Sequence, residues 1–71
     1  MPEKWTGRLI GKMHNECITY DDLAKELGIS KEYAGMILNG RRKPDGIRKR
    51  MEEAVDAIIK RRSSEVSNAA N

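Results

Sequence analysis

The hydrophobic pattern is clearest near the middle of the chain, where apolar residues recur at helical spacing. Leu23, Ala24 and Leu27 fall on one stripe of a short helix, and most of the positions around them are charged. Thr19 precedes this stripe and can cap the helix, with Asp22 three residues later in the spacing of a capping box. The segment therefore predicts an amphipathic helix that begins at Thr19.

A second short helix follows, after a turn that the sequence also specifies. Gly28 comes directly after the last apolar residue of the first helix, where a left-handed residue commonly ends a helix. Ser30 can then cap the next helix, whose inner face is expected to carry Ala34, Ile37 and Leu38. Two short helices joined by a tight turn form a helix-turn-helix, a motif that points to DNA binding.

A further helix is expected before this pair, over residues 3–14, because apolar residues recur every four positions from Trp5 to Met13. His14 is expected on the surface near its end, and Cys17 as a small part-buried residue between helices. One cysteine cannot form an internal disulfide, and one histidine cannot build a metal site alone.

The last helix is expected to begin after Pro44 and Asp45, which act as a stop and an N-cap, and to run to about Arg62. Val55 and Ile59 widen its apolar stripe. They are expected either to complete the core of a monomer or to join two copies of the chain. The central stripe of the helix consists of Ile47, Met51, Ala54 and Ile58.

Length and composition agree with this pattern. A chain of 71 residues allows one domain with a thin core. With no Phe, one Trp and two Tyr, that core must come from aliphatic residues and Met, and no segment alternates as a strand would. We expect a small all-α bundle of four helices, or five at most, over residues 1–62. Residues 63–71 lack periodicity and caps and are expected to form a disordered tail.

The net charge of +3 is distributed unevenly along the chain. Residues 41–50 carry six Lys or Arg against one Asp, a local charge of +5, whereas residues 16–32 carry five acidic residues against two lysines, a local charge of −3. A basic run is usually only a solvated face. This one directly follows the second short helix, where a docked helix-turn-helix passes the phosphate backbone.

The segments LAKELGIS (23–30) and ILNGRRKP (37–44) resemble the helix-turn-helix of Cro and phage repressors, and the resemblance covers about residues 8–60. It implies a sequence-specific transcriptional regulator, most plainly a phage or prophage repressor, acting in the cytoplasm of a bacterial or phage-infected cell. Such proteins bind a double-stranded DNA operator, and a homodimer is expected. Members of this family use the loop after Asn-Gly to hold the DNA backbone.

The outer face of the second short helix is expected to read bases in the major groove. Glu32 can accept from a cytosine amine, Met36 can touch a thymine methyl group, and Gly35 can admit close backbone approach. The predicted base-reading residues are Ser30, Lys31, Glu32, Gly35, Met36 and Asn39. The predicted phosphate contacts are Thr19, Tyr20, Tyr33, Arg41, Arg42 and Lys43.

The chain departs from the family pattern in two places. Position 20 is often Gln in the family, where it contacts phosphate or base, and here it is Tyr20. Related domains commonly use a fifth helix to dimerise, so their dimer mode does not carry over. Tyr33 has a second interpretation, because its ring could equally pack on the edge of the domain.

A different class of function also fits the sequence. The helix-turn-helix scaffold could hold a protein partner, as in an antitoxin or antirepressor, because the first short helix is acidic and the second has few basic residues. No enzyme is expected, since the sequence shows no paired carboxylates in an evident cleft, no nucleophile beside a base and no phosphate-binding Gly-rich loop after a strand. No cofactor, metal, small-molecule ligand or membrane contact is expected either, and no apolar run approaches the ~20 residues of a membrane span.

Overall fold

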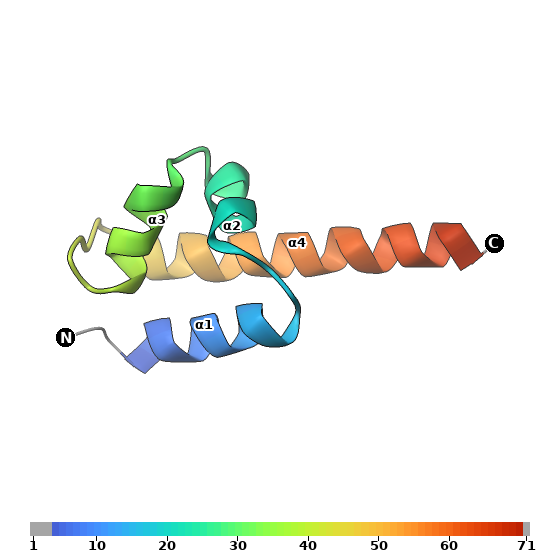
Figure 1. The fold of residues 1–71 in the computed structure, drawn as a ribbon, viewed down its shortest axis with the longest axis horizontal. Helices are drawn as coiled ribbons and strands as arrows, with labels where there is room; N and C mark the ends of the chain where they lie inside the picture. The colour runs from blue at the N-terminus through green and yellow to red at the C-terminus, as the bar shows by residue number, and fades with distance from the viewer. Residues whose placement is uncertain (1–3, 71) are drawn as a thin grey trace.

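Four helices make up the part of the chain that the structure describes (Figure 1). The computed structural model describes the backbone of residues 4–70 and the side chains of residues 4–64. Within them there is no strand, which confirms the expected all-α class. The helices are α1 (Lys4–Asn15), α2 (Tyr20–Leu27), α3 (Lys31–Leu38) and α4 (Ile47–Ala70).

α4 is the helix on which the others assemble. α1 lies along one side of α4, and α2 and α3 pack together across its other side (Figure 1). Each helix contributes the apolar stripe that the sequence predicted, and burial of these side chains is the main stabilising term. The buried apolar residues are Leu9, Met13, Ile18, Leu23, Ala24, Ala34, Ile37, Leu38, Ile47, Met51, Ala54, Val55 and Ile58.

The two residues that widen the stripe of α4 belong to the monomer. Val55 is 0% exposed, so the interpretation of this residue as part of a seam between two copies is wrong. Ile59 is half-buried and packs against the same core. A small domain has few apolar groups to spare, and this core uses both.

α1, α2 and α3 end in the same backbone motif, in which a left-handed residue turns the chain out of the helix. At the end of α2, the N–H of Ile29 donates to the carbonyl of Ala24 at 3.0 Å, and the N–H of Gly28 donates to that of Lys25 at 3.3 Å. Gly28 has a φ of 72°, as predicted. The residues in the left-handed position are Cys17, Gly28 and Gly40.

Cys17 is therefore not the part-buried residue that the sequence predicted. It is exposed and has a φ of 57°, because it occupies the left-handed position after α1 that glycine holds after α2 and α3. The next residue, Ile18, enters the core instead and is 5% exposed. His14 lies on the surface in the last turn of α1, as expected.

The two ends of α4 differ from the prediction. The helix begins at Ile47 after Gly46, whose carbonyl accepts the N–H of Arg50 at 3.2 Å. Gly46 thus stands where Asp45 was expected as the N-cap. The predicted end near Arg62 is also wrong, because the helix continues to Ala70 through a segment without Gly or Pro. The division into a domain of residues 1–62 and a tail stays a prediction.

We predict that Cys17→Gly stabilises the protein. A residue with a Cβ strains the left-handed conformation, and the exposed Cys17 side chain contributes little packing. The free energy of unfolding should rise by about 0.5–1 kcal/mol, which corresponds to a melting temperature about 2–8 °C higher.

Gly28→Ala is the matched control, because a Cβ there meets nothing within 4 Å and only the backbone conformation is affected. It should lower the melting temperature in circular dichroism by a similar amount. A lower melting temperature for Cys17→Gly would contradict the prediction.

Candidate nucleic-acid interface

The N-terminus of α2 is closed by a reciprocal pair of hydrogen bonds. The Thr19 hydroxyl accepts the backbone N–H of Asp22 at 3.1 Å, and the Thr19 N–H donates to Asp22 Oδ2 at 3.0 Å. This is the predicted capping box. The bond from the Thr19 N–H is the main cause that lowers the pKa of the Asp22 carboxyl, partial burial opposes it, and Arg62 contributes to the lowering.

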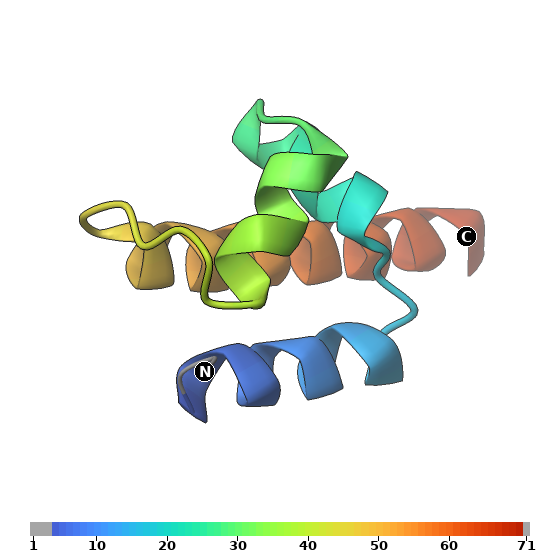
Figure 2. The ribbon, with the colours of Figure 1, turned by 60° about the vertical axis from the view of Figure 1, so that its left-hand side comes forward.

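α3 begins with a simpler cap and exposes one long face. The Ser30 hydroxyl accepts the N–H of Tyr33 at 3.0 Å, as the sequence predicted. The inner face, which carries Ala34, Ile37 and Leu38, is buried. Figure 2 shows α3 crossing in front of α4, with its outer side turned away from the rest of the domain.

Most of the predicted base-reading residues lie on this outer face. Met36, at 38% exposure, is a large apolar side chain left in solvent. Gly35 is half-buried, because the ring of Tyr20 lies over it: a Cβ on Gly35 would stand 3.8 Å from two ring carbons. The exposed members of the predicted set are Ser30, Lys31, Glu32, Met36 and Asn39.

The predicted phosphate contacts divide into two groups. Thr19 is exposed, whereas Tyr20 and Tyr33 are half-buried and pack against the core. For Tyr33 this is the packing on the domain edge that the sequence left open, and its contact with DNA stays a prediction. Thr19 accepts a bond through its hydroxyl oxygen and still has the hydroxyl proton to donate.

The second group is the loop between α3 and α4. Arg41, Arg42 and Lys43 are all exposed. The N–H groups of Arg41 and Arg42 both point to the carbonyl of Met36, at 2.8 and 3.3 Å. The start of the basic loop is therefore attached to the base-reading helix itself.

A cavity of about 270 Å³ opens beside this loop, between the start of α1 and the start of α4. Arg42, Lys43 and Arg48 line it together with the ring of Trp5. Sequence analysis did not single out Arg48, because it lies in α4, beyond the loop in the chain. Its position three residues before the core residue Met51 gave no signal of this arrangement.

Residues 18–48 match a family model described as helix-turn-helix. This segment is a helix-turn-helix of the lambda repressor and Cro type. The match contains all the predicted base and phosphate contacts, and it supports a DNA-binding regulator in general. No curated protein and no solved structure matches the chain.

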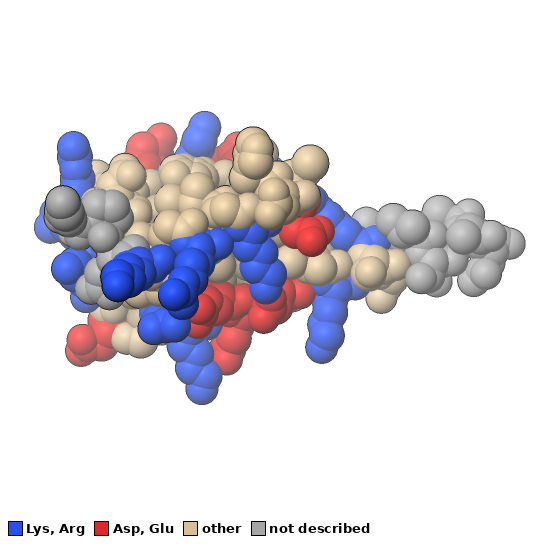
Figure 3. Space-filling model, turned by 90° about the horizontal axis from the view of Figure 1, so that it is seen from below, with Lys and Arg blue, Asp and Glu red and all other residues tan. Residues whose placement is uncertain are grey.

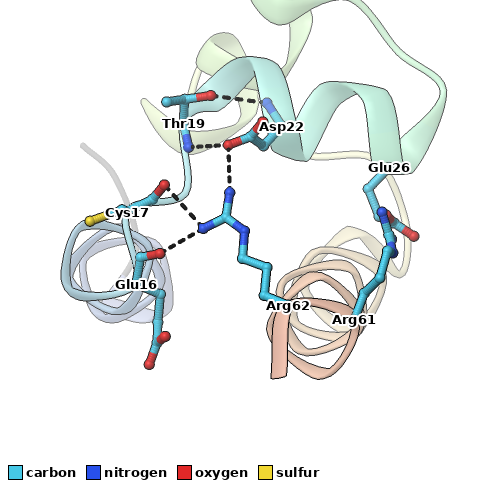
Figure 4. A network of polar contacts seen from close by, with 7 residues as sticks. All are labelled: Glu16, Cys17, Thr19, Asp22, Glu26, Arg61 and Arg62. Carbon is cyan, nitrogen blue, oxygen red and sulfur yellow. Dashed lines mark hydrogen bonds and ion pairs between the residues drawn. The ribbon is translucent and has the colours of Figure 1, made fainter. Parts of the chain in front are cut away.

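The acidic side of the helix-turn-helix is neutralised from within the domain. Asp22 Oδ2 lies 3.2 Å from Arg62 Nη2, and Glu26 forms an ion pair with Arg61 (Figure 4). Both arginines come from α4. Sequence analysis missed them, because these pairs join residues far apart in the chain and helical spacing does not show them.

The face formed by α1 and α4 has a different charge pattern. Seen from the α1 side, lysines and arginines stand beside acidic side chains (Figure 3). Lys12 Nζ lies 2.7 Å from Asp56 Oδ1, and this hydrogen bond raises the pKa of Lys12. In contrast, Arg41 and Arg42 make no ion pair within the described part of the chain, so their charge is available to a ligand.

Among the described residues, no group of three or more His, Cys, Asp or Glu side chains could hold a metal ion. In that same part of the chain, no helix is both long enough and apolar enough to cross a membrane.

We predict that Gly35→Ala separates folding from DNA binding. An alanine Cβ would make only ordinary contact with the Tyr20 ring, and replacing glycine inside a helix should raise the free energy of unfolding by about 0.5–1 kcal/mol. If this face of α3 approaches DNA closely, the same change should weaken binding. The melting temperature and a gel-retardation titration measure the two effects.

Gly11→Ala in α1 is the control, because it removes an exposed helical glycine with nothing within 4 Å of the added Cβ. It should stabilise the protein and leave DNA affinity unchanged. Unchanged affinity for Gly35→Ala as well would argue against close approach at this position.

Proposed function

We propose that the protein is a sequence-specific transcriptional repressor of the Cro type, of phage or prophage origin, which reads operator DNA with α3. The observation that carries this proposal is the division of α3 into two faces. Its inner face is buried in the core, whereas its outer face presents exposed polar and apolar side chains at one end of the molecule, opposite to the end of α4 (Figure 1). A helix with one free face can enter the major groove.

In this proposal the side chains of α3 read bases by hydrogen bonding and apolar contact. Glu32 accepts from the N4 amine of a cytosine, and Met36 contacts the methyl group of a thymine. Lys31 and Asn39 stand at the two ends of the same face, and each can reach a base edge or an adjacent phosphate. Ser30 begins the face, and its cap hydroxyl still has a proton to donate.

Phosphate contacts would position the helix without selecting a sequence. Thr19 and Tyr20 stand at the start of α2, and Arg41, Arg42 and Lys43 follow the end of α3. These groups lie before and after the recognition helix in the chain, so each can contact the backbone beside the groove that α3 enters.

A homodimer follows from the size of the recognition helix. α3 has eight residues, too few to contact a long DNA sequence, and two-fold proteins read two half-sites about 34 Å apart. Because Val55 is buried, we place the contact between copies on α4 beyond Ile59, where the helix continues past its ion pairs with α2.

The alternative, a scaffold that holds a protein partner, loses its main support. It drew on the acidity of α2, and Asp22 and Glu26 are already paired with Arg62 and Arg61. The acidic surface available to a basic partner is correspondingly small. A partner bound tightly at high salt, with no DNA bound at low salt, would restore this alternative.

We predict that the protein selects a palindromic site from a pool of random duplexes. If a dimer neutralises about eight phosphates, the logarithm of the affinity should fall against the logarithm of salt concentration with a slope of about −6 to −8. Gel retardation over a series of salt concentrations measures this slope. Failure to retard any selected duplex at low salt would refute the proposed function.

We also predict that phosphate and base contacts respond differently to mutation. Arg41→Ala and Arg42→Ala should weaken binding to all sequences alike and flatten the salt slope by about 0.9 for each phosphate that is no longer neutralised. Glu32→Ala and Met36→Ala should instead change the preferred base at one or two positions by ~1–3 kcal/mol.

Repeating the selection with each variant distinguishes these outcomes. Lys49→Ala is a control for the loss of one positive charge, since Lys49 is exposed in the first turn of α4 and outside the predicted contacts. A base preference that survives every substitution on the outer face of α3 would show that another element reads the DNA.

A further inference from the structure

One side chain of α4 joins the ends of two other helices. Arg62 Nη1 donates to the carbonyl of Glu16 at 2.7 Å and to that of Cys17 at 3.2 Å. Its Nη2 donates to Asp22 Oδ2 at 3.2 Å. Figure 4 shows the guanidinium reaching from α4 into the turn between α1 and α2, with all three acceptors around it.

Each acceptor is a group that needs a partner. The last carbonyls of a helix lack intrahelical donors, and those of Glu16 and Cys17 follow the end of α1. Cys17 also holds a left-handed conformation that is unusual for a residue with a side chain. Arg62 therefore holds a turn that its own sequence does not favour.

The third acceptor connects this turn to the helix-turn-helix. Asp22 Oδ2 accepts both Arg62 Nη2 and the backbone N–H of Thr19. The same oxygen thus closes the capping box of α2 and anchors it to α4. Tyr20, the first residue of α2, lies with its ring over Gly35 of α3, so the first turn of α2 also touches the recognition helix.

We propose that Arg62 is a positioning residue for DNA binding, which holds the first turn of α2 in the place where Thr19 and Tyr20 meet the phosphate backbone. This inference rests on the proposed function. Arg62 acts through Asp22 and the α1–α2 turn and makes no DNA contact itself. A planar guanidinium suits this role, because its donors form a rigid fork that can serve several acceptors at once.

The neighbouring arginine provides a matched control. Arg61 has the same charge on the same helix, but its ion pair is with Glu26, in the second half of α2 and away from the cap. Loss of either arginine changes the net charge equally. Only the loss of Arg62 should release the first turn of α2.

The test compares Arg62→Ala, Arg61→Ala and the unmodified full chain on one duplex selected from a random pool. We expect Arg62→Ala to bind about tenfold more weakly, the loss that corresponds to one charge-assisted hydrogen bond. Its salt slope and base preference should be unchanged, whereas a direct phosphate contact would flatten the slope by about 0.9. Arg61→Ala should remain within about twofold of the unmodified protein.

Arg62→Lys keeps the charge and keeps the inference testable if the alanine variant does not fold. An ammonium group can pair with Asp22 but cannot reproduce the fork, so we expect only partial recovery of affinity. A double-mutant cycle with Asp22→Asn should show losses that do not add, because both changes break the same link.

Hydrogen exchange in the free protein supplies a readout that needs no DNA. The amide of Thr19 should exchange faster in Arg62→Ala than in Arg61→Ala. Equal exchange in the two variants, equal affinities or a flattened salt slope would overturn the positioning role while leaving the proposed function intact. A wild-type protein that binds no duplex would instead refute the proposed function, and with it any role of Arg62 in DNA binding.

Discussion

The close crossing of α2 and α3 is the contact on which the rest of the structure depends. Helices of eight residues are too short to be stable alone in water, so they persist only where tertiary burial stabilises them. Ala24 and Ala34 are 2% and 0% exposed, and their small side chains let the two helices approach closely. Because this crossing and α4 occupy the inner face of α3, its outer face remains for a ligand.

Charge is arranged so that an acidic helix does not prevent DNA binding. α2 would present an unfavourable field to phosphate if Asp22 and Glu26 were unpaired. Arg62 and Arg61 neutralise both from α4, while the basic loop after α3 keeps its exposed cations. The local charge of residues 16–32 therefore says less about the partner than the pairing between helices does.

The parts of the fold that the sequence predicted well depend on neighbouring residues. The capping box at Thr19, the left-handed Gly28 and the cap at Ser30 are local signals, and the structure confirms all three. The prediction for Cys17 was wrong because the turn after α1 requires a left-handed residue there and places Ile18 in the core. The ion pairs of Arg61 and Arg62 could not be predicted, since they depend on how α4 lies against α2. For the candidate site, the sequence predicted which residues of α3 are exposed, but not the Tyr20 ring over Gly35.

The outer face of α3 separates what the protein recognises from what keeps it folded. Within the described residues, the side chains of Lys31, Glu32 and Met36 make no hydrogen bond or ion pair, and the caps and core that hold α3 lie elsewhere. Substitutions at these positions carry little cost in stability. A lineage of such proteins can therefore acquire new target sequences one residue at a time, while the same scaffold continues to fold.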